Sequence, residues 1–208
     1  MPELKLAVCI PSGDMVHMDF AASLGVMLAQ LAARQVPSVL INEKSAVLQR
    51  SRQTLVNRAL SQEASHLLFL DSDMIFPPDT ALRLLAHKVD IVGVAAAKRR
   101  PPFTPSALTL QGEPLVFSPG DGLVEAGSIG LAGTLIRAEV FRQIGKPWFP
   151  VTWQGEDDSG ADLWTGEDYG FCEKVRQAGL QISVDAQLSY QFGHLGQRRF
   201  ALDRSAGS

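Results

Sequence analysis

Apolar runs and amphipathic segments alternate along the first half of the chain. Short runs of apolar residues are typical of buried strands, whereas apolar positions three or four apart indicate helices. The strands are expected at 4–13, 36–42, 66–70 and 90–97, and the helices between them at 19–35, 44–64 and 79–88. This alternation predicts an α/β fold with a mostly parallel central sheet flanked by helices.

The second half is less regular. Residues 98–122 contain five prolines, which predicts short antiparallel strands or a loop. The segments that follow are expected to form a strand and a helix at 128–145, a loop rich in Trp, Gly and Asp at 146–166, a helix at 167–179 that ends at Gly179, and a strand at 180–188. We expect one domain over 1–208, with a ligand-binding half at about 1–97, a second half at about 98–200 and a disordered tail at 201–208.

Composition narrows the possible partners. The 208 residues are 46% hydrophobic and 20% charged, with a net charge of -3. This balance gives no general attraction to nucleic acid, so we expect no nucleic-acid partner. We also expect no signal peptide and no transmembrane segment. Cys9 and Cys172 are expected to be buried thiols, and the protein is expected to be cytoplasmic.

An acidic pair follows the third predicted strand, in "LLFLDSDMIFPPDT" at 67–80. Asp71 and Asp73 fall at the carboxyl end of that strand, where open α/β sheets bind ligands. Residues two apart on an extended segment point the same way. Two adjacent carboxylates attract a hard divalent cation such as Mn²⁺ or Mg²⁺. The alternative is a simple acidic turn.

Two further features lie downstream. Glu167 and Asp168 open the predicted helix at 167–179, where they would either cap the helix or supply a general base. His194 follows the last strand within "FGHLG". Imidazole is a suitable ligand for Mn²⁺-like metals, and a structural hydrogen bond is the alternative.

The order of these three features resembles the GT-A glycosyltransferases, and is similar to family 2 and related bacterial or phage enzymes. The resemblance rests on the strand ending in Asp-Ser-Asp, on "GEDYGFCEKVRQAG" and on "FGHLG", and "RSRQTLVNRAL" resembles the segment before the acidic motif. It spans about residues 5–196. It implies a Rossmann-like nucleotide-diphospho-sugar transferase fold with a small antiparallel portion on the acceptor side.

The resemblance also implies a metal-dependent transfer from a UDP- or GDP-sugar to a carbohydrate or other hydroxyl acceptor. The implied roles are metal binding by Asp71, Asp73 and His194, donor binding by Pro11, Ser12, Arg52, Asp71, Ser72 and Asp73, and base catalysis by Asp168 with Glu167 beside it. Asp168 would act as the base if the enzyme inverts the anomeric centre.

Several assignments stay open. Gly133 or Thr134 would touch the sugar or pack tightly, and "KRRPP" at 98–102 would bind phosphate or be a solvated loop. The three tryptophans would stack on sugars or serve as core or lid residues.

The alternative functions are a haloacid-dehalogenase-like phosphohydrolase, a nucleotide-sugar pyrophosphorylase and a non-catalytic nucleotide-sugar-binding protein. The phosphohydrolase family usually has Thr or Val where Ile75 stands, and the pyrophosphorylases have a Gly-rich signature that "CIPSGDMVH" lacks.

Overall fold

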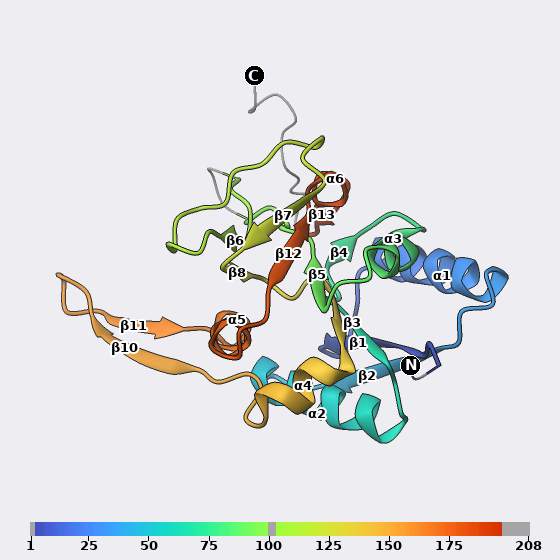
Figure 1. Cartoon of the computed structure of the whole chain (residues 1–208), viewed down its shortest axis with the longest axis horizontal. Helices are drawn as coiled ribbons and strands as arrows, with labels where there is room; N and C mark the ends of the chain where they lie inside the picture. The colour runs from blue at the N-terminus through green and yellow to red at the C-terminus, as the bar shows by residue number, and fades with distance from the viewer. Residues whose placement is uncertain (1–2, 100–102, 197–208) are drawn as a thin grey trace.

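A seven-stranded sheet forms the centre of the fold, in a computed structural model that describes residues 3–99 and 103–196 (Figure 1). Across the sheet the strands are β2 (Ser38–Lys44), β1 (Leu6–Ser12), β3 (His66–Leu70), β9 (Gly133–Arg137), β5 (Ile91–Gly93), β12 (Ile182–Asp185) and β7 (Leu123–Ala126). β9 and β7 run opposite to the other five. The predicted α/β fold with a mostly parallel sheet is therefore confirmed.

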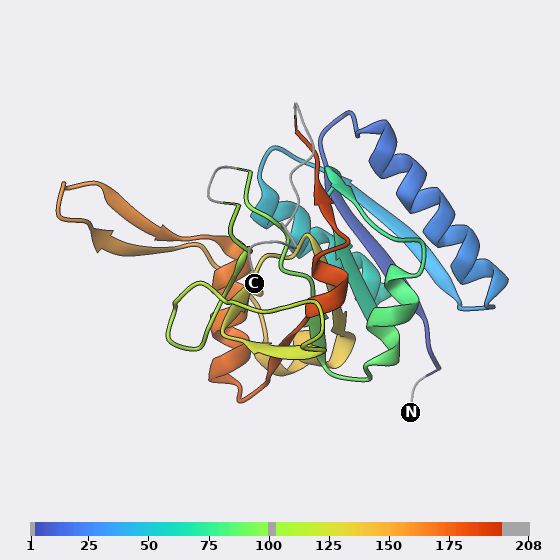
Figure 2. The same cartoon turned by 90° about the horizontal axis from the view of Figure 1, so that it is seen from above.

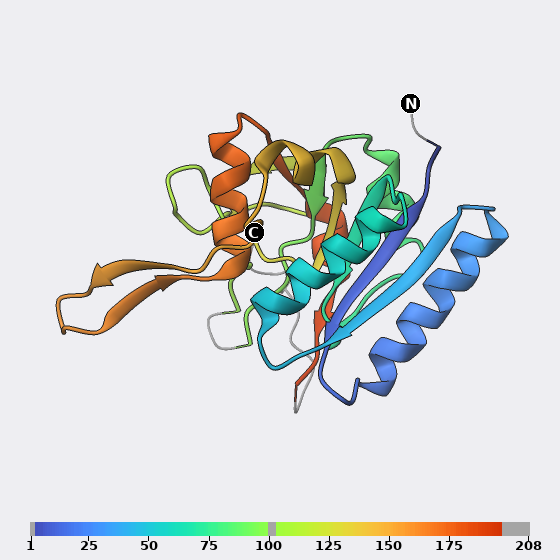
Figure 3. The same cartoon turned by 90° about the horizontal axis from the view of Figure 1, so that it is seen from below.

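Helices cover both faces of the sheet, and strand β1 shows why. Leu6, Val8 and Ile10 belong to one apolar cluster, while the alternate residues Ala7 and Cys9 belong to the other. Side chains of successive strand residues point to opposite faces, so an unbroken apolar run needs cover on both. The first cluster includes residues of α1 (Met18–Ala33), α3 (Thr80–Ala86) and α6 (Ala186–Ser189). The second includes residues of α2 (Leu48–Ser61), α4 (Ala138–Ile144) and α5 (Glu167–Gln177), which lie over one face in Figure 3.

Both halves of the sequence contribute to this one sheet. β9, from the second half, lies between β3 and β5 of the first half and is antiparallel to both. The two halves predicted on either side of residue 97 therefore share one sheet.

The expectation of a loop at 146–166 is wrong for its central part. Residues 152–165 form an antiparallel hairpin of β10 (Thr152–Glu156) and β11 (Asp162–Thr165), which extends away from the rest of the molecule (Figure 2). Trp153 stands opposite Trp164, and Asp157 Oδ1 accepts hydrogen bonds from the amides of Ser159 and Ala161 in the turn. The high Gly and Asp content of this segment is typical of loops, so the sequence did not indicate the cross-strand pairing.

Two short ladders complete the fold near the carboxyl ends of the main strands. β6 (Ala107–Leu108) pairs with β8 (Ser128–Ile129), which gives the second half the short antiparallel strands expected there. β4 (Met74–Ile75) pairs with β13 (Gly193–His194). The second pairing brings the end of the described chain beside the acidic motif.

The sequence also predicted buried thiols, no transmembrane segment, a tail and a basic run. The two cysteines are free and buried. Within the ranges the structure describes, no helix is long and apolar enough to cross a membrane. The tail at 201–208 and residues 100–102 of the basic run lie outside the described residues.

Candidate functional site

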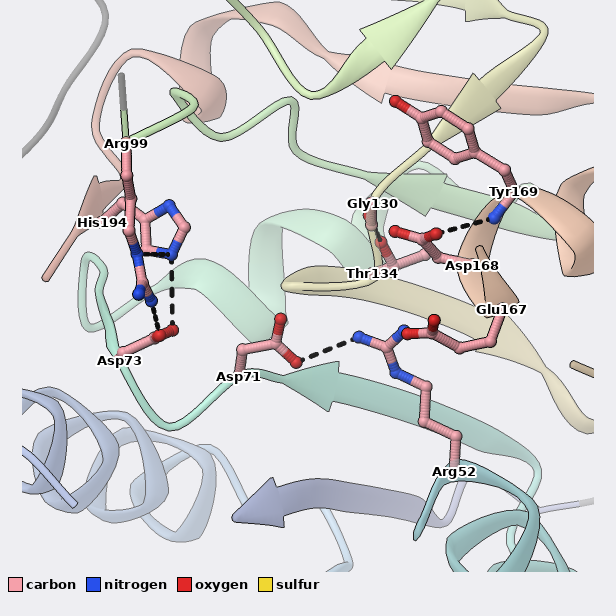
Figure 4. Close-up of polar contacts among 10 residues, drawn as sticks. All are labelled: Arg52, Asp71, Asp73, Arg99, Gly130, Thr134, Glu167, Asp168, Tyr169 and His194. Carbon is pink, nitrogen blue, oxygen red and sulfur yellow. Dashed lines mark hydrogen bonds and ion pairs between the residues drawn. The ribbon is translucent and has the colours of Figure 1, made fainter. Parts of the chain in front are cut away.

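The two carboxylates of the acidic motif do not point the same way. The amide of Asp71 donates to Ala132 O at 3.3 Å, and Met74 N donates to Asp71 O at 3.2 Å, so the chain turns directly after β3. Asp71 then faces Arg52, whereas Asp73 faces His194 (Figure 4). The expectation of two parallel side chains is wrong, because it assumed an extended backbone that a turn replaces.

Asp73, His194 and Arg99 form one polar cluster. Arg99 makes an ion pair with Asp73, and its Nε donates to His194 Nε2 at 2.8 Å. The other ring nitrogen of His194, Nδ1, lies 3.0 Å from the carbonyl oxygen of Ala97. Both contacts are satisfied when Nδ1 carries the proton and Nε2 presents a lone pair. Burial lowers the pKa of His194, which also favours the neutral ring.

This cluster has donor atoms suited to a divalent cation. Asp73 Oδ1 is buried and has no hydrogen-bond partner among the residues that the structure describes, and His194 Nε2 lies 3.6 Å from it. Carboxylate oxygen and neutral imidazole are both ligands of Mn²⁺. Asp71, the third predicted ligand, is turned toward Arg52 instead. Among the described residues, no group of three or more His, Cys, Asp or Glu side chains is placed to hold a metal ion.

Arg52 links the acidic motif to α5. Its side chain is only 2% exposed, and it contacts Glu167 Oε1 at 2.5 Å and Asp71 Oδ1 at 3.2 Å. The sequence suggested a contact with the donor base or phosphates, whereas in the structure both terminal nitrogens of the guanidinium contact carboxylates. Arg52 therefore positions Asp71 and Glu167, and Glu167 is engaged as its partner.

Asp168 follows Glu167 in the first turn of α5. Its Oδ1 accepts a hydrogen bond from Tyr169 N at 2.8 Å, which fixes the orientation of the carboxylate. Burial raises the pKa of Asp168, Arg52 opposes that shift, and Glu167 and Asp71 add to it. A carboxyl group with a raised pKa is a stronger base at neutral pH than an ordinary aspartate, as general-base catalysis requires.

Two adjoining hollows surround these residues. The hollow of about 290 Å³, here called the Ser12 hollow, brings together five of the six residues predicted to bind the donor: Pro11, Ser12, Asp71, Ser72 and Asp73. The hollow of about 420 Å³, here called the Asp168 hollow, is lined by Asp168. Asp71, Arg99 and His194 line both.

Sequence reasoning missed Ser106 and Gly130, which line the Asp168 hollow. A β-carbon on Gly130 would lie 3.6 Å from Asp168 Oδ2, so glycine keeps the space beside the carboxylate open. Ser106 lies in the proline-rich segment at 98–122 and Gly130 in the segment at 128–145, and neither position was given a role. Arg99 was part of the basic run but was given no individual role.

The other residues considered as sugar contacts are either packed in the interior or exposed on the hairpin. A β-carbon on Gly133 would lie 2.6 Å from the Phe192 ring, and Thr134 is fully buried. Trp148 is a core residue whose indole donates to Phe141 O at 2.8 Å. Trp153 and Trp164 are exposed on the hairpin.

Comparison with known proteins identifies the fold. No family model and no curated protein matches the chain. Among solved structures, A197 from the virus STIV aligns with a TM-score of 0.61 and 18% identity, over 97% of this chain and 91% of that one. A mutant Drosophila β-1,4-galactosyltransferase 7, in complex with manganese, UDP-Gal and xylobiose, aligns with a TM-score of 0.55 and 16% identity, over 96% of this chain and 76% of that one. The chain has a GT-A-like fold, as the sequence resemblance implied.

Proposed function

We propose that this chain transfers a sugar from a nucleotide-diphospho-sugar, of the UDP or GDP class, to a hydroxyl group of an acceptor. The observation that carries the proposal is the meeting of two hollows at Asp71. One hollow gathers residues at the carboxyl ends of β1 and β3, the edge where open α/β sheets bind nucleotides. The other contains a buried carboxylate with a raised pKa. A donor in the first hollow would therefore present its sugar beside a base in the second.

The proposed chemistry assigns each residue a limited task. Pro11, Ser12 and Ser72 bind the donor. Asp168 accepts the proton of the acceptor hydroxyl as that oxygen attacks the anomeric carbon, which gives an inverting transfer. Tyr169 N holds the carboxylate in place through its hydrogen bond.

Asp73 and His194 are the residues that would hold Mn²⁺ or Mg²⁺, once Arg99 turns away from them. Such an ion neutralises charge on the departing nucleoside diphosphate. The manganese and UDP-Gal bound to the Drosophila neighbour support the proposed metal and donor class.

A donor screen tests the proposal. Release of UDP and GDP is measured from a panel of nucleotide sugars with Mn²⁺ and simple glycosides, for the wild type and for Asp168→Asn. We expect turnover of one donor, reduced about 10²–10⁴-fold in Asp168→Asn because the base is lost. Glu139→Gln, on the exposed face of α4, is the matched control and should behave as the wild type. Release of phosphate from phosphomonoesters without nucleotide-sugar turnover would favour the phosphohydrolase, and equal turnover in Asp168→Asn would overturn the base.

A further inference from the structure

An open groove of about 330 Å³ lies between the hairpin and α5, here called the Tyr169 groove. The hairpin contributes Gln154, and α5 contributes Tyr169, Glu173 and Arg176. The turn at 108–112 forms the opposite wall. The chemistry proposed at Asp168 uses the backbone amide of Tyr169 but none of the side chains that line this groove.

Three polar side chains of the groove have no hydrogen-bond or ion-pair partner within the described part of the chain. No hydrogen bond or ion pair involves the Tyr169 hydroxyl, the Glu173 carboxylate or the Arg176 guanidinium there. Glu173 and Arg176 are three residues apart on one helix, a spacing at which opposite charges commonly pair. The groove thus offers an unpaired carboxylate acceptor and unpaired guanidinium and hydroxyl donors side by side.

This mixture suits a neutral ligand with many hydroxyl groups. Each sugar hydroxyl both donates and accepts, so it can use Glu173 and Arg176 together. A phosphate would gain from Arg176 but be repelled by Glu173. The ring of Tyr169 adds an apolar face of the kind that packs against a sugar ring.

The hairpin has a β-bulge at the residue that lines this groove. The strand register shifts between Trp153 and Gly155, so Gln154 falls outside the regular ladder. Gly155 has a φ of 111°, a conformation that favours glycine. Bulges re-aim side chains and are common beside active sites. Here the displaced residue, Gln154, lines the Tyr169 groove.

The groove and the Asp168 hollow are lined by neighbouring residues at the β6–β8 ladder. Ser106 and Gly130 line the hollow, whereas Leu108 and Ser128 line the groove. Strand residues two apart are separated by about 7 Å. On α5, Asp168 lines the hollow and the next residue lines the groove. A chain of sugars entering the hollow would therefore extend into the groove.

We propose that the Tyr169 groove is an acceptor subsite for the second sugar of an oligosaccharide whose first sugar presents its hydroxyl to Asp168. The inference rests on the proposed function and names its acceptor class. Arg176 and Glu173 hydrogen-bond the second sugar, and Tyr169 packs against its ring. A monosaccharide acceptor leaves the groove empty.

Kinetics with acceptors of increasing length test the subsite. The probes are xylo-, cello-, malto- and chito-oligosaccharides of one to three sugars, used with the donor identified by the screen. We expect kcat/KM of the wild type to rise about 10- to 100-fold from one sugar to two in the series it uses, the value of a charged hydrogen bond. In Arg176→Ala the disaccharide should lose that gain through a higher KM, with kcat unchanged. Glu173→Gln should show the same pattern, and Arg142→Ala on α4 is the control.

The outcomes separate the subsite from the proposed function. Equal kcat/KM for one and two sugars overturns the subsite, as does an Arg176→Ala variant that weakens the monosaccharide and the disaccharide alike. Donor hydrolysis without transfer to any probe also overturns it, while leaving the proposed donor site intact. Absence of any nucleotide-sugar turnover overturns the proposed function and the subsite together.

Discussion

Replacing Arg52 by methionine tests the connection between the acidic motif and α5. The side chain is 2% exposed and contacts Glu167 at 2.5 Å and Asp71 at 3.2 Å. Methionine keeps much of the length and apolar character but leaves two carboxylates without their cation. Removing one partner of a buried ion pair costs about 3–5 kcal/mol.

The lower end of that range applies to this site. The Asp71 side chain is 29% exposed and recovers part of its hydration when Arg52 is lost. We therefore expect the free energy of unfolding to fall by about 3 kcal/mol. A protein of this length loses about 2–4 °C of melting temperature for each kcal/mol, so Tm should fall by about 6–12 °C.

Thermal unfolding followed by circular dichroism provides the assay. Arg58→Met is the matched control, because Arg58 pairs with Glu43 at 3.4 Å with a side chain that is 48% exposed. Such surface pairs are worth at most about 1 kcal/mol, so Tm should fall by no more than about 4 °C. Neutralising Asp71 and Glu167 as Asn and Gln in the Arg52→Met background should recover most of the loss. Equal Tm values for Arg52→Met and Arg58→Met would refute the buried bridge.

Three further predictions concern neighbouring residues. Because burial raises the pKa of Asp168, activity should be lost as pH falls through that raised value. The acid limb of the kcat/KM profile should therefore lie above the ordinary aspartate value near 4, and a limb at about 4 would contradict this. Arg99→Ala should tighten Mn²⁺ binding in calorimetry, since it removes a cation from Asp73 and His194, and weaker binding would show that Arg99 supports the site. Gly133→Ala should lower the stability to urea by about 1–3 kcal/mol by overpacking against Phe192, whereas an altered sugar KM at unchanged stability would indicate a sugar contact.

Local patterns predicted the elements that carry the site. The strand expected at 66–70 is β3 with the same bounds, and the helix expected at 167–179 is α5, Glu167–Gln177, with Gly179 at a φ of 74° just beyond it. These elements have strong signals, an unbroken apolar run in one case and an acidic start with a glycine stop in the other. Strands β1 and β3 end at a common edge of the sheet. For this reason one hollow contains the predicted residues Pro11, Ser12, Asp71, Ser72 and Asp73.

Contacts between distant segments could not be predicted in the same way. Arg52 is predicted to bind the donor, yet its partners in the structure are carboxylates that lie 19 and 115 residues away. The orientation of Asp71 and Asp73 depends on a turn that is set by Ala132 and by the β4–β13 pairing. Trp153 and Trp164 pair across a hairpin whose bulge interrupts the alternation that would have revealed it.

The most direct test of the proposed donor site is a calorimetric titration of UDP and of GDP, with and without Mn²⁺. One of the two nucleotides should bind the wild-type protein at least about tenfold more tightly with Mn²⁺, a difference of about 1.4 kcal/mol. Asp73→Asn should abolish that difference, because Asp73 provides the cluster's buried carboxylate oxygen, which lies 3.6 Å from His194 Nε2. Nucleotide affinity that is the same with and without the metal, or no binding of either nucleotide, would contradict the account.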